Sequence, residues 1–98
     1  WKLKFYIYYH PSMDLRQLIE RVEWCRKNEC LPYVMRDAAC WESELNHFLI
    51  DYASHCNQPG MFKNLDFEQF LEIRHKGKSI SQARKENSRK IYEGIQTK

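Results

Sequence analysis

Cysteine offers the most varied chemistry in this chain, because a thiolate can bind a metal, form a disulfide or act as a nucleophile. The four residues Cys25, Cys30, Cys40 and Cys56 have four, nine and fifteen residues between them. No pair has the C-x-x-C spacing of a zinc ribbon or a redox site. Cys25 and Cys56 also fall on apolar faces of expected helices, where a free thiol behaves as a small hydrophobe. We expect reduced, structural cysteines and no metal site.

Two alternatives for the cysteines stay open. Cys56 could bind a metal together with His55 or His47, because thiolate and imidazole are both zinc ligands. Disulfides are the second alternative, and an oxidising compartment would favour them. His47 and His55 lie eight residues apart, two helical turns, so they could share a face. We expect both histidines to be solvated.

Four further residues are candidate ligand contacts because of their position at strand ends. Tyr8 and His10 close the first expected strand, and Arg36 and Asp37 close the second. Open α/β sheets bind ligands outside the carboxyl ends of their strands, and a guanidinium suits phosphate or carboxylate. Each residue also has a plainer interpretation: Tyr8 and His10 continue an aromatic surface row from Tyr6, and Arg36 with Asp37 ends a strand. We name these four as candidate cofactor-binding residues and name no catalytic residue.

The elements that position these residues form a βαβ unit. Residues 3–9 and 31–36 are largely apolar or aromatic on both faces, as in parallel strands with helices on both sides. Between them, an apolar stripe from Leu15 to Cys25 at steps of three and four predicts a helix. Asp14, with Gln17, is its expected N-cap. The fold class is therefore α/β, with a crossover of the right-handed kind that parallel strands nearly always use.

Two or three helices follow the second strand, after a loop over residues 35–42. Ser43 with Asn46 can open the first, whose apolar stripe runs to Cys56 and which Pro59-Gly60 should end. Asp66 with Gln69 has the capping pattern of a short helix that ends before Gly77, with an apolar face that includes Ile73. Residues 81–96 are helical by propensity but carry few apolar side chains. We expect a core over residues 1–75 and a basic, peripheral helical tail over residues 76–98.

Charge supports this division of the chain. Residues 1–71 hold 8 Lys or Arg against 10 acids, whereas residues 72–98 hold 8 against 3. No apolar run approaches the roughly 20 residues that span a bilayer, and no signal peptide is visible. We expect a cytoplasmic chain without membrane contact. Trp1 stands where a methionine would begin a complete chain, which favours an N-terminal truncation.

Short hydrophobic motifs follow one another over residues 3–74: Phe5-Tyr6-Ile7-Tyr8-Tyr9, Trp24-Cys25, Leu31-Pro32-Tyr33-Val34-Met35-Arg36-Asp37, Phe48 to Tyr52, and Phe62-Lys63 before Leu65-Asp66-Phe67. Their order resembles the C-terminal end of an uncharacterised group of radical SAM proteins. It implies the last strands of a partial TIM-like barrel, that is, a fragment of a larger parallel α/β barrel. Such proteins bind S-adenosylmethionine and a [4Fe–4S] cluster held in a C-x-x-x-C-x-x-C loop. This chain has no such loop, so we transfer no cluster ligand and expect no cofactor in the chain alone.

Two hypotheses for function follow. In the first, the chain is a fragment of a radical SAM-like protein, not catalytic by itself, which covers its open sheet edges by forming a homodimer or by joining the missing N-terminal part of a barrel. In the second, it is a small binding module whose basic tail contacts nucleic acid or an acidic protein partner. An independent enzyme ranks third, because no nucleophile with a base, paired carboxylates or phosphate loop is recognisable.

Overall fold

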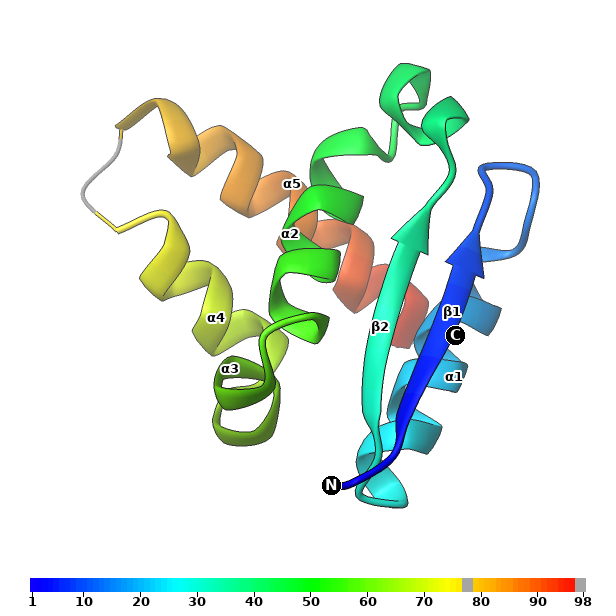
Figure 1. The fold of residues 1–98 in the computed structure, drawn as a ribbon. Helices are drawn as coiled ribbons and strands as arrows, with labels where there is room; N and C mark the ends of the chain where they lie inside the picture. Colours follow the sequence, from blue (N-terminus) through cyan, green and yellow to red (C-terminus); the bar gives the residue numbers. More distant parts are fainter. Residues whose placement is uncertain (77–78, 97–98) are drawn as a thin grey trace.

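The chain begins with the expected βαβ unit (Figure 1). The computed structural model describes residues 1–76 and 79–96. In it, strand β1 (Lys4–Tyr9) and strand β2 (Leu31–Arg36) pair in parallel, with Phe5 opposite Pro32. Helix α1 (Leu15–Lys27) connects the strands, and the side chain of its N-cap, Asp14, accepts a hydrogen bond from the Arg16 amide at 3.0 Å. The strands and the helix of this unit are therefore confirmed.

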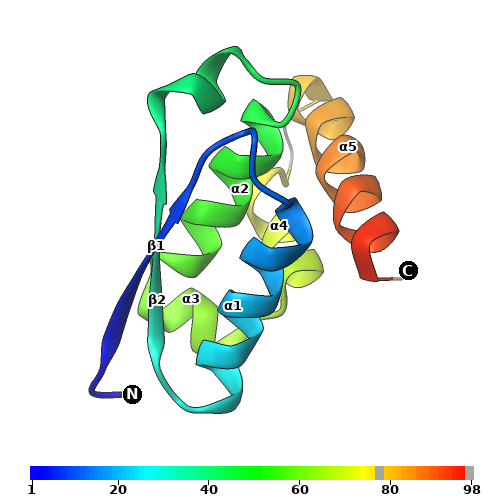
Figure 2. The same cartoon turned by 90° about the vertical axis from the view of Figure 1, so that its right-hand side faces the viewer.

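Helices cover one face of the two-stranded sheet, as Figure 2 shows with the sheet nearly edge-on. Both α1 and α2 (Asn46–Cys56) lie on that side, and Ile7, Tyr9 and Val34 point toward them, each at most 7% exposed. We expected both faces of the strands to be covered. Within the described residues only one face is, because the chain after β2 returns to the side that α1 already covers, and Tyr6, Tyr8 and Met35 on the opposite face are exposed.

The segment after β2 differs from expectation in two places. Residues 38–42, expected as loop, form a 3-10 helix (Ala38–Glu42) capped by Asp37. We expected Ser43 to open the next helix, but helix α2 starts three residues later, at Asn46. The Ser43 hydroxyl instead accepts a hydrogen bond from the Leu45 amide in the turn before the helix. The apolar stripe expected on α2 is confirmed, since Phe48, Leu49, Tyr52, Ala53 and Cys56 are all buried.

Pro59 begins a helix here, whereas we expected it only to end one. Helix α2 is followed at once by the short helix α3 (Pro59–Asn64), with proline in its first turn. Proline fits there because the first amides of a helix have no intrahelical partner to lose. The turn lets Phe62 of α3 pack against the core, where it is fully buried.

Helix α4 (Phe67–Arg74) has the expected capping box. The Asp66 carboxylate accepts from the Gln69 amide at 2.7 Å, and the Gln69 side chain accepts from the Asp66 amide at 3.0 Å. The apolar face was assigned wrongly at one position, because Ile73 is 54% exposed. Ile73 lies two residues beyond the buried Leu71, which places it about 200° away around the helix.

Helix α5 (Ser79–Gln96), the segment expected to be peripheral, packs along α2 and α4. Ile91 and Tyr92 pack against the core, and Ser88 is fully buried. The Ser88 hydroxyl donates to the buried Asp51 carboxylate at 2.7 Å, and Asp51 also pairs with Arg74 of α4 at 2.9 Å. A polar cluster thus joins α2, α4 and α5. Among the described helices, none is both long and apolar enough to cross a membrane.

Candidate interaction surface

The structure brings together two of the four residues predicted as ligand contacts. The Tyr8 hydroxyl donates a hydrogen bond to the Asp37 carboxylate, which raises the pKa of Tyr8 and lowers that of Asp37. Asp37 also accepts from the Ala39 amide at 2.9 Å and so caps the 3-10 helix. The hydrogen bonds of Tyr8 and Asp37 therefore stabilise the connection that follows β2.

The other two predicted residues point elsewhere. His10 lies in the turn after β1, where its Nδ1 accepts from the Ser12 amide at 3.0 Å. Arg36 alternates with Asp37 along the strand, so it belongs to the helix-covered side and is partly buried. Its Nη1 is buried and has no hydrogen-bond partner within the described part of the chain. The four residues therefore do not converge on one ligand.

Of the two histidine predictions, one is confirmed and the other is wrong. His47 is exposed, as expected, but His55 is 1% exposed and its Nε2 donates toward the carbonyls of Leu65 and Met61, at 2.8 and 3.2 Å. The expectation of a solvated His55 is wrong because α3 folds over it, and burial lowers its pKa. All four cysteines are free and buried, and burial raises the pKa of Cys56. Among the described residues no three His, Cys, Asp or Glu side chains gather in a metal-binding group.

Two of the three outward-pointing residues on the outer edge of β2 are blocked against a further strand. The ladder joins Leu31 to Leu3 and Asp37 to Tyr9 through hydrogen bonds of 2.8 Å, so the alternate residues Pro32, Val34 and Arg36 point their backbone groups outward. Pro32 has no N–H to offer a further strand. At Val34, the Asn57 side chain accepts from the amide at 2.7 Å and donates to the carbonyl at 3.1 Å. Asn57 thus occupies the position of a neighbouring strand.

The outer edge of β1 has no such closure. By the same alternation, Lys4, Tyr6 and Tyr8 point their backbone groups outward. Within the described residues, the amides and carbonyls of these three find no hydrogen-bond partner. The free stretch ends at His10, whose carbonyl accepts from the Met13 amide at 2.8 Å. Figure 1 shows α2 beside β2, and Figure 2 shows that α1, which overlaps β1 in the first view, lies on the helix-covered side of the sheet.

Aromatic and apolar side chains surround this open edge. On the uncovered face, Tyr6 is 69% exposed and its ring lies 5.6 Å from that of Tyr33. On the helix side, the rings of Phe5 and Trp24 meet edge to face at 5.6 Å. A groove of about 240 Å³ runs between β1 and α1, lined by Phe5, Tyr6, Ile7, Arg21, Trp24 and Cys25. Contiguous exposed apolar surface of this kind is characteristic of interaction sites.

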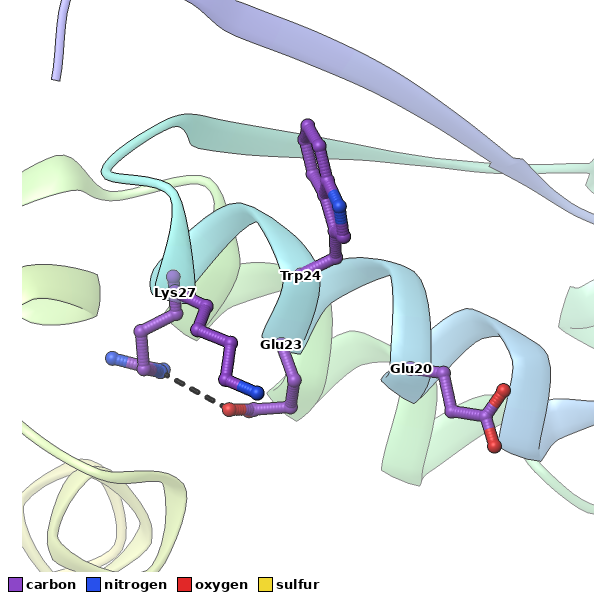
Figure 3. Close-up of a pocket in the computed structure, with 5 residues that line it drawn as sticks. Glu20, Glu23, Trp24 and Lys27 are labelled. Carbon is purple, nitrogen blue, oxygen red and sulfur yellow. Dashed lines mark ion pairs between the residues drawn. The ribbon is translucent and has the colours of Figure 1, made fainter.

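A second hollow, of about 530 Å³, lies along α1 and carries mixed charges (Figure 3). Glu23 pairs with Arg26 at 3.5 Å, while Trp24 and Glu20 point to different sides of the helix. The Arg26 guanidinium also donates to the Phe62 carbonyl at 2.6 Å and covers the Phe62 ring. Because Arg26 is already engaged in packing, this hollow offers a ligand no free cationic contact from that residue.

Two cations of the basic segment, Lys85 and Arg89, are ion-paired within the chain. Lys85 pairs with Glu72 at 3.2 Å, and Arg89 pairs with Glu86 at 2.7 Å. Arg89 also lies 3.4 Å from Glu93. These pairs reduce the positive field that α5 presents to an acidic partner.

Comparison with known proteins gives no relative: no family model, no curated protein and no solved structure matches this chain. The likeness to radical SAM proteins therefore stays a prediction that rests on motif order. Asn57 could not be predicted as a functional residue, because its role depends on a contact between segments 23 residues apart. Pro32 was the available signal, since a proline inside a strand is typical of a sheet edge.

Proposed function

We propose that this chain is a non-catalytic assembly module whose sheet is completed at the β1 edge by a strand from a second copy. The observation that carries the proposal is the difference between the two edges. Proteins commonly blunt an edge strand with proline, bulges or a covering element, because free N–H and C=O groups recruit other strands. β2 is blunted by Pro32 and Asn57, whereas three residues of β1 keep free backbone groups.

The surface around β1 is large enough to contribute substantially to a dimer. Phe5, Tyr6, Tyr8 and Trp24 are between 40% and 69% exposed. At roughly 150–250 Å² for a whole aromatic side chain, these four present about 300–500 Å². A specific interface takes about 800 Å² from each partner. The aromatic residues thus supply about half of that area, and the β1 backbone and its neighbours supply more.

The resemblance to radical SAM proteins agrees with this assignment of the edges. In a barrel that ends with these strands, β1 would pair with the preceding strand and β2 would be the last one, with its edge closed. S-adenosylmethionine and a [4Fe–4S] cluster would then belong to the complete protein, and this chain would contribute strands without cluster ligands. For this chain alone, a second copy is the occupant of the β1 edge that we propose.

The proposal is tested by the mass of the protein in solution, measured by light scattering after size exclusion. We expect twice the chain mass of 12.0 kDa for the wild type. Tyr6→Pro removes an outward N–H without touching the β1–β2 ladder, so it should leave a folded monomer. Tyr6→Phe keeps the amide and should remain a dimer.

Circular dichroism and urea unfolding check that Tyr6→Pro is folded. If it is not, Lys4→Pro serves instead, because the first residue of a strand tolerates proline. A wild-type monomer at micromolar concentration would overturn the proposal. A dimer that persists in a folded proline variant would equally exclude β1 as the edge that joins the copies.

The hypothesis of a basic binding module is the weaker one, because Lys85 and Arg89 are held by acids of the same chain. Removal of residues 76–98 would be a poor test of it, because it would also remove Ser88 and Tyr92, which pack on the core. Neutralising exposed cations such as Arg84 and Lys90 is the cleaner experiment. If nucleic acid binds through α5, these changes should weaken binding and reduce its salt dependence.

A further inference from the structure

We infer that the two copies pair through antiparallel β1 strands centred on Tyr6, so that a four-stranded sheet forms in the order β2, β1, β1, β2. This inference rests on the proposed function and specifies its geometry. It assigns an interaction surface, the β1 edge with its flanking side chains, and it assigns the partner as the same surface of a second copy. A twofold axis through Tyr6 would make this a closed, isologous contact.

The backbone sets the register. An antiparallel ladder requires outward-pointing residues of the two strands to stand opposite each other. Lys4, Tyr6 and Tyr8 are the outward-pointing residues of β1. Pairing Tyr6 with itself places Lys4 opposite Tyr8 of the partner subunit, and all three residues of both strands find partners. A shift of two residues either way leaves outward groups unpaired, or places Lys4 against the turn at His10.

A parallel pair of the same two edges does not close. In a parallel ladder an inward-pointing residue stands opposite one that points away, as Phe5 stands opposite Pro32 between β1 and β2. Two identical strands then pair only with an offset of one residue. Such an offset is incompatible with a twofold axis, so the antiparallel arrangement is the closed solution for identical copies.

The side chains on the uncovered face complement each other in this register. Lys4 comes opposite Tyr8 of the partner subunit, whose hydroxyl is bonded to Asp37 in each copy. In the single chain the Lys4 ammonium lies 5.5 Å from the centre of the Tyr33 ring, and in the pair it would also have the Tyr8 ring and the Asp37 carboxylate of the other strand within reach. Tyr6 meets its own counterpart on the axis, a cross-strand aromatic pair of the kind that stabilises sheets.

The helix side is complementary as well. Phe5 comes opposite Ile7 of the partner subunit, and the reverse pair is equivalent by symmetry. Phe5 is 40% exposed and Trp24 is 53% exposed in the single chain. The groove between β1 and α1 opens at this same edge, so the second copy would cover its apolar wall. The contact thus buries side chains on both faces of the joined strands.

Cysteine cross-linking tests the register directly, because all four native cysteines are buried and should be protected from the reagent in the folded protein. The full-length variants Tyr6→Cys, Lys4→Cys and Tyr8→Cys are each treated with a short bifunctional thiol reagent. In the proposed pair, residue 6 lies about 5.5 Å from its counterpart. Residue 4 lies four positions, roughly 13 Å, from its own counterpart along the strand.

We expect Tyr6→Cys to cross-link with itself and Lys4→Cys to cross-link with Tyr8→Cys in a mixture, each several-fold more than Lys4→Cys or Tyr8→Cys alone. Wild-type protein treated in the same way is the control for the native thiols. Lys4→Cys cross-linking with itself as efficiently as Tyr6→Cys would overturn the register. A dimer by light scattering without the expected cross-links refutes this geometry and leaves the proposed function standing, whereas a wild-type monomer refutes both.

Discussion

The two edges of the sheet differ although the strands have the same length and lie side by side. β2 is closed by a proline within the strand and by the side chain of Asn57, the C-cap residue of α2. β1 presents three residues with free backbone groups beside an apolar groove. An edge is therefore protected by what lies next to it as well as by its own residues. The difference indicates which side of this small sheet is available to a partner.

The Asn57 amide is effective because it presents an acceptor and a donor at the spacing of a peptide group. Both of its hydrogen bonds go to the same residue, Val34, at the middle of the strand. A further strand on this side would have to displace Asn57 and would still meet Pro32, which cannot donate. In the proposed assembly, Pro32 and Asn57 would limit association to the other strand, which would favour a dimer over a chain of molecules.

Opening the edge of β2 should have the largest effect. In the double variant Pro32→Val with Asn57→Ala, β2 gains an amide at residue 32 and loses the side chain that blocks the Val34 backbone. Both edges of the sheet can then pair with another strand. We expect the mass measured by light scattering to rise well beyond that of a dimer and to increase with concentration. Adding Tyr6→Pro closes β1 again and should limit the assembly to dimers. An unchanged dimer in the double variant would show that Pro32 and Asn57 do not guard this edge.

Asn57→Ala alone should lower the stability of the fold. The Val34 amide and carbonyl lose their partners, and a polar group left unpaired costs about 1–3 kcal/mol. The free energy of unfolding, measured with urea, should fall by an amount in this range. Gln58→Ala is the matched control: its side chain bonds the Ser54 carbonyl at the exposed end of α2, and its removal should change stability by less than about 0.5 kcal/mol. Equal effects of the two substitutions would contradict the role assigned to Asn57.

Much of the fold could be predicted because its signals are local. The apolar stripe of α1, the capping box at Asp66 and the stripe of α2 each lie within a few residues, and the structure confirms them. Pro59 was misread because proline ends one helix and begins another with equal ease. The open face of the sheet could not be predicted, since aromatic residues on both sides of a strand indicate that both sides are suited to burial but not what covers them.

The candidate site was less predictable, because it depends on contacts between segments that are distant in the sequence. Position at strand ends singled out Tyr8 and Asp37 as candidates, yet it could not show that their mutual bond and the cap at Ala39 use these groups within the chain. Helical spacing alone could not show that α3 buries His55. The closure of β2 depends on Asn57, which is distant in sequence from the strand it protects. Contacts of this kind come from tertiary structure and have no periodic signature.

Acid should lower the free energy of unfolding through the protonation of His55, which is buried among the helices. Burial lowers its pKa in the folded state, so the unfolded chain takes up the proton first as the pH falls below about 6.5. Its contribution to stability is complete above that pH and decreases below it, by at most about 1.4 kcal/mol per pH unit for one proton. Urea unfolding at pH 7.5 and 5.5, in the Tyr6→Pro monomer, should show a larger loss than in the same monomer with His55→Gln. Equal losses in the two proteins would mean that His55 is not the group responsible.

Lys4→Glu should produce the smallest effect, and it distinguishes the electrostatic part of the β1 contact from the backbone part. In the inferred register the new carboxylate faces Asp37 of the partner subunit, so attraction becomes repulsion at two equivalent places. Cross-strand charge pairs contribute roughly 0.2–1 kcal/mol each, and dimer dissociation should become several-fold easier at low salt. The difference from wild type should shrink at high salt, because exposed charges are screened over about 10 Å at 0.1 M.

Lys90→Glu makes the same change of net charge on the exposed surface of α5, away from β1, and should leave the dimer unaffected. If both substitutions weaken the dimer equally, overall charge rather than the register governs association, and the pairing of Lys4 with the Tyr8–Asp37 end of the other strand is wrong.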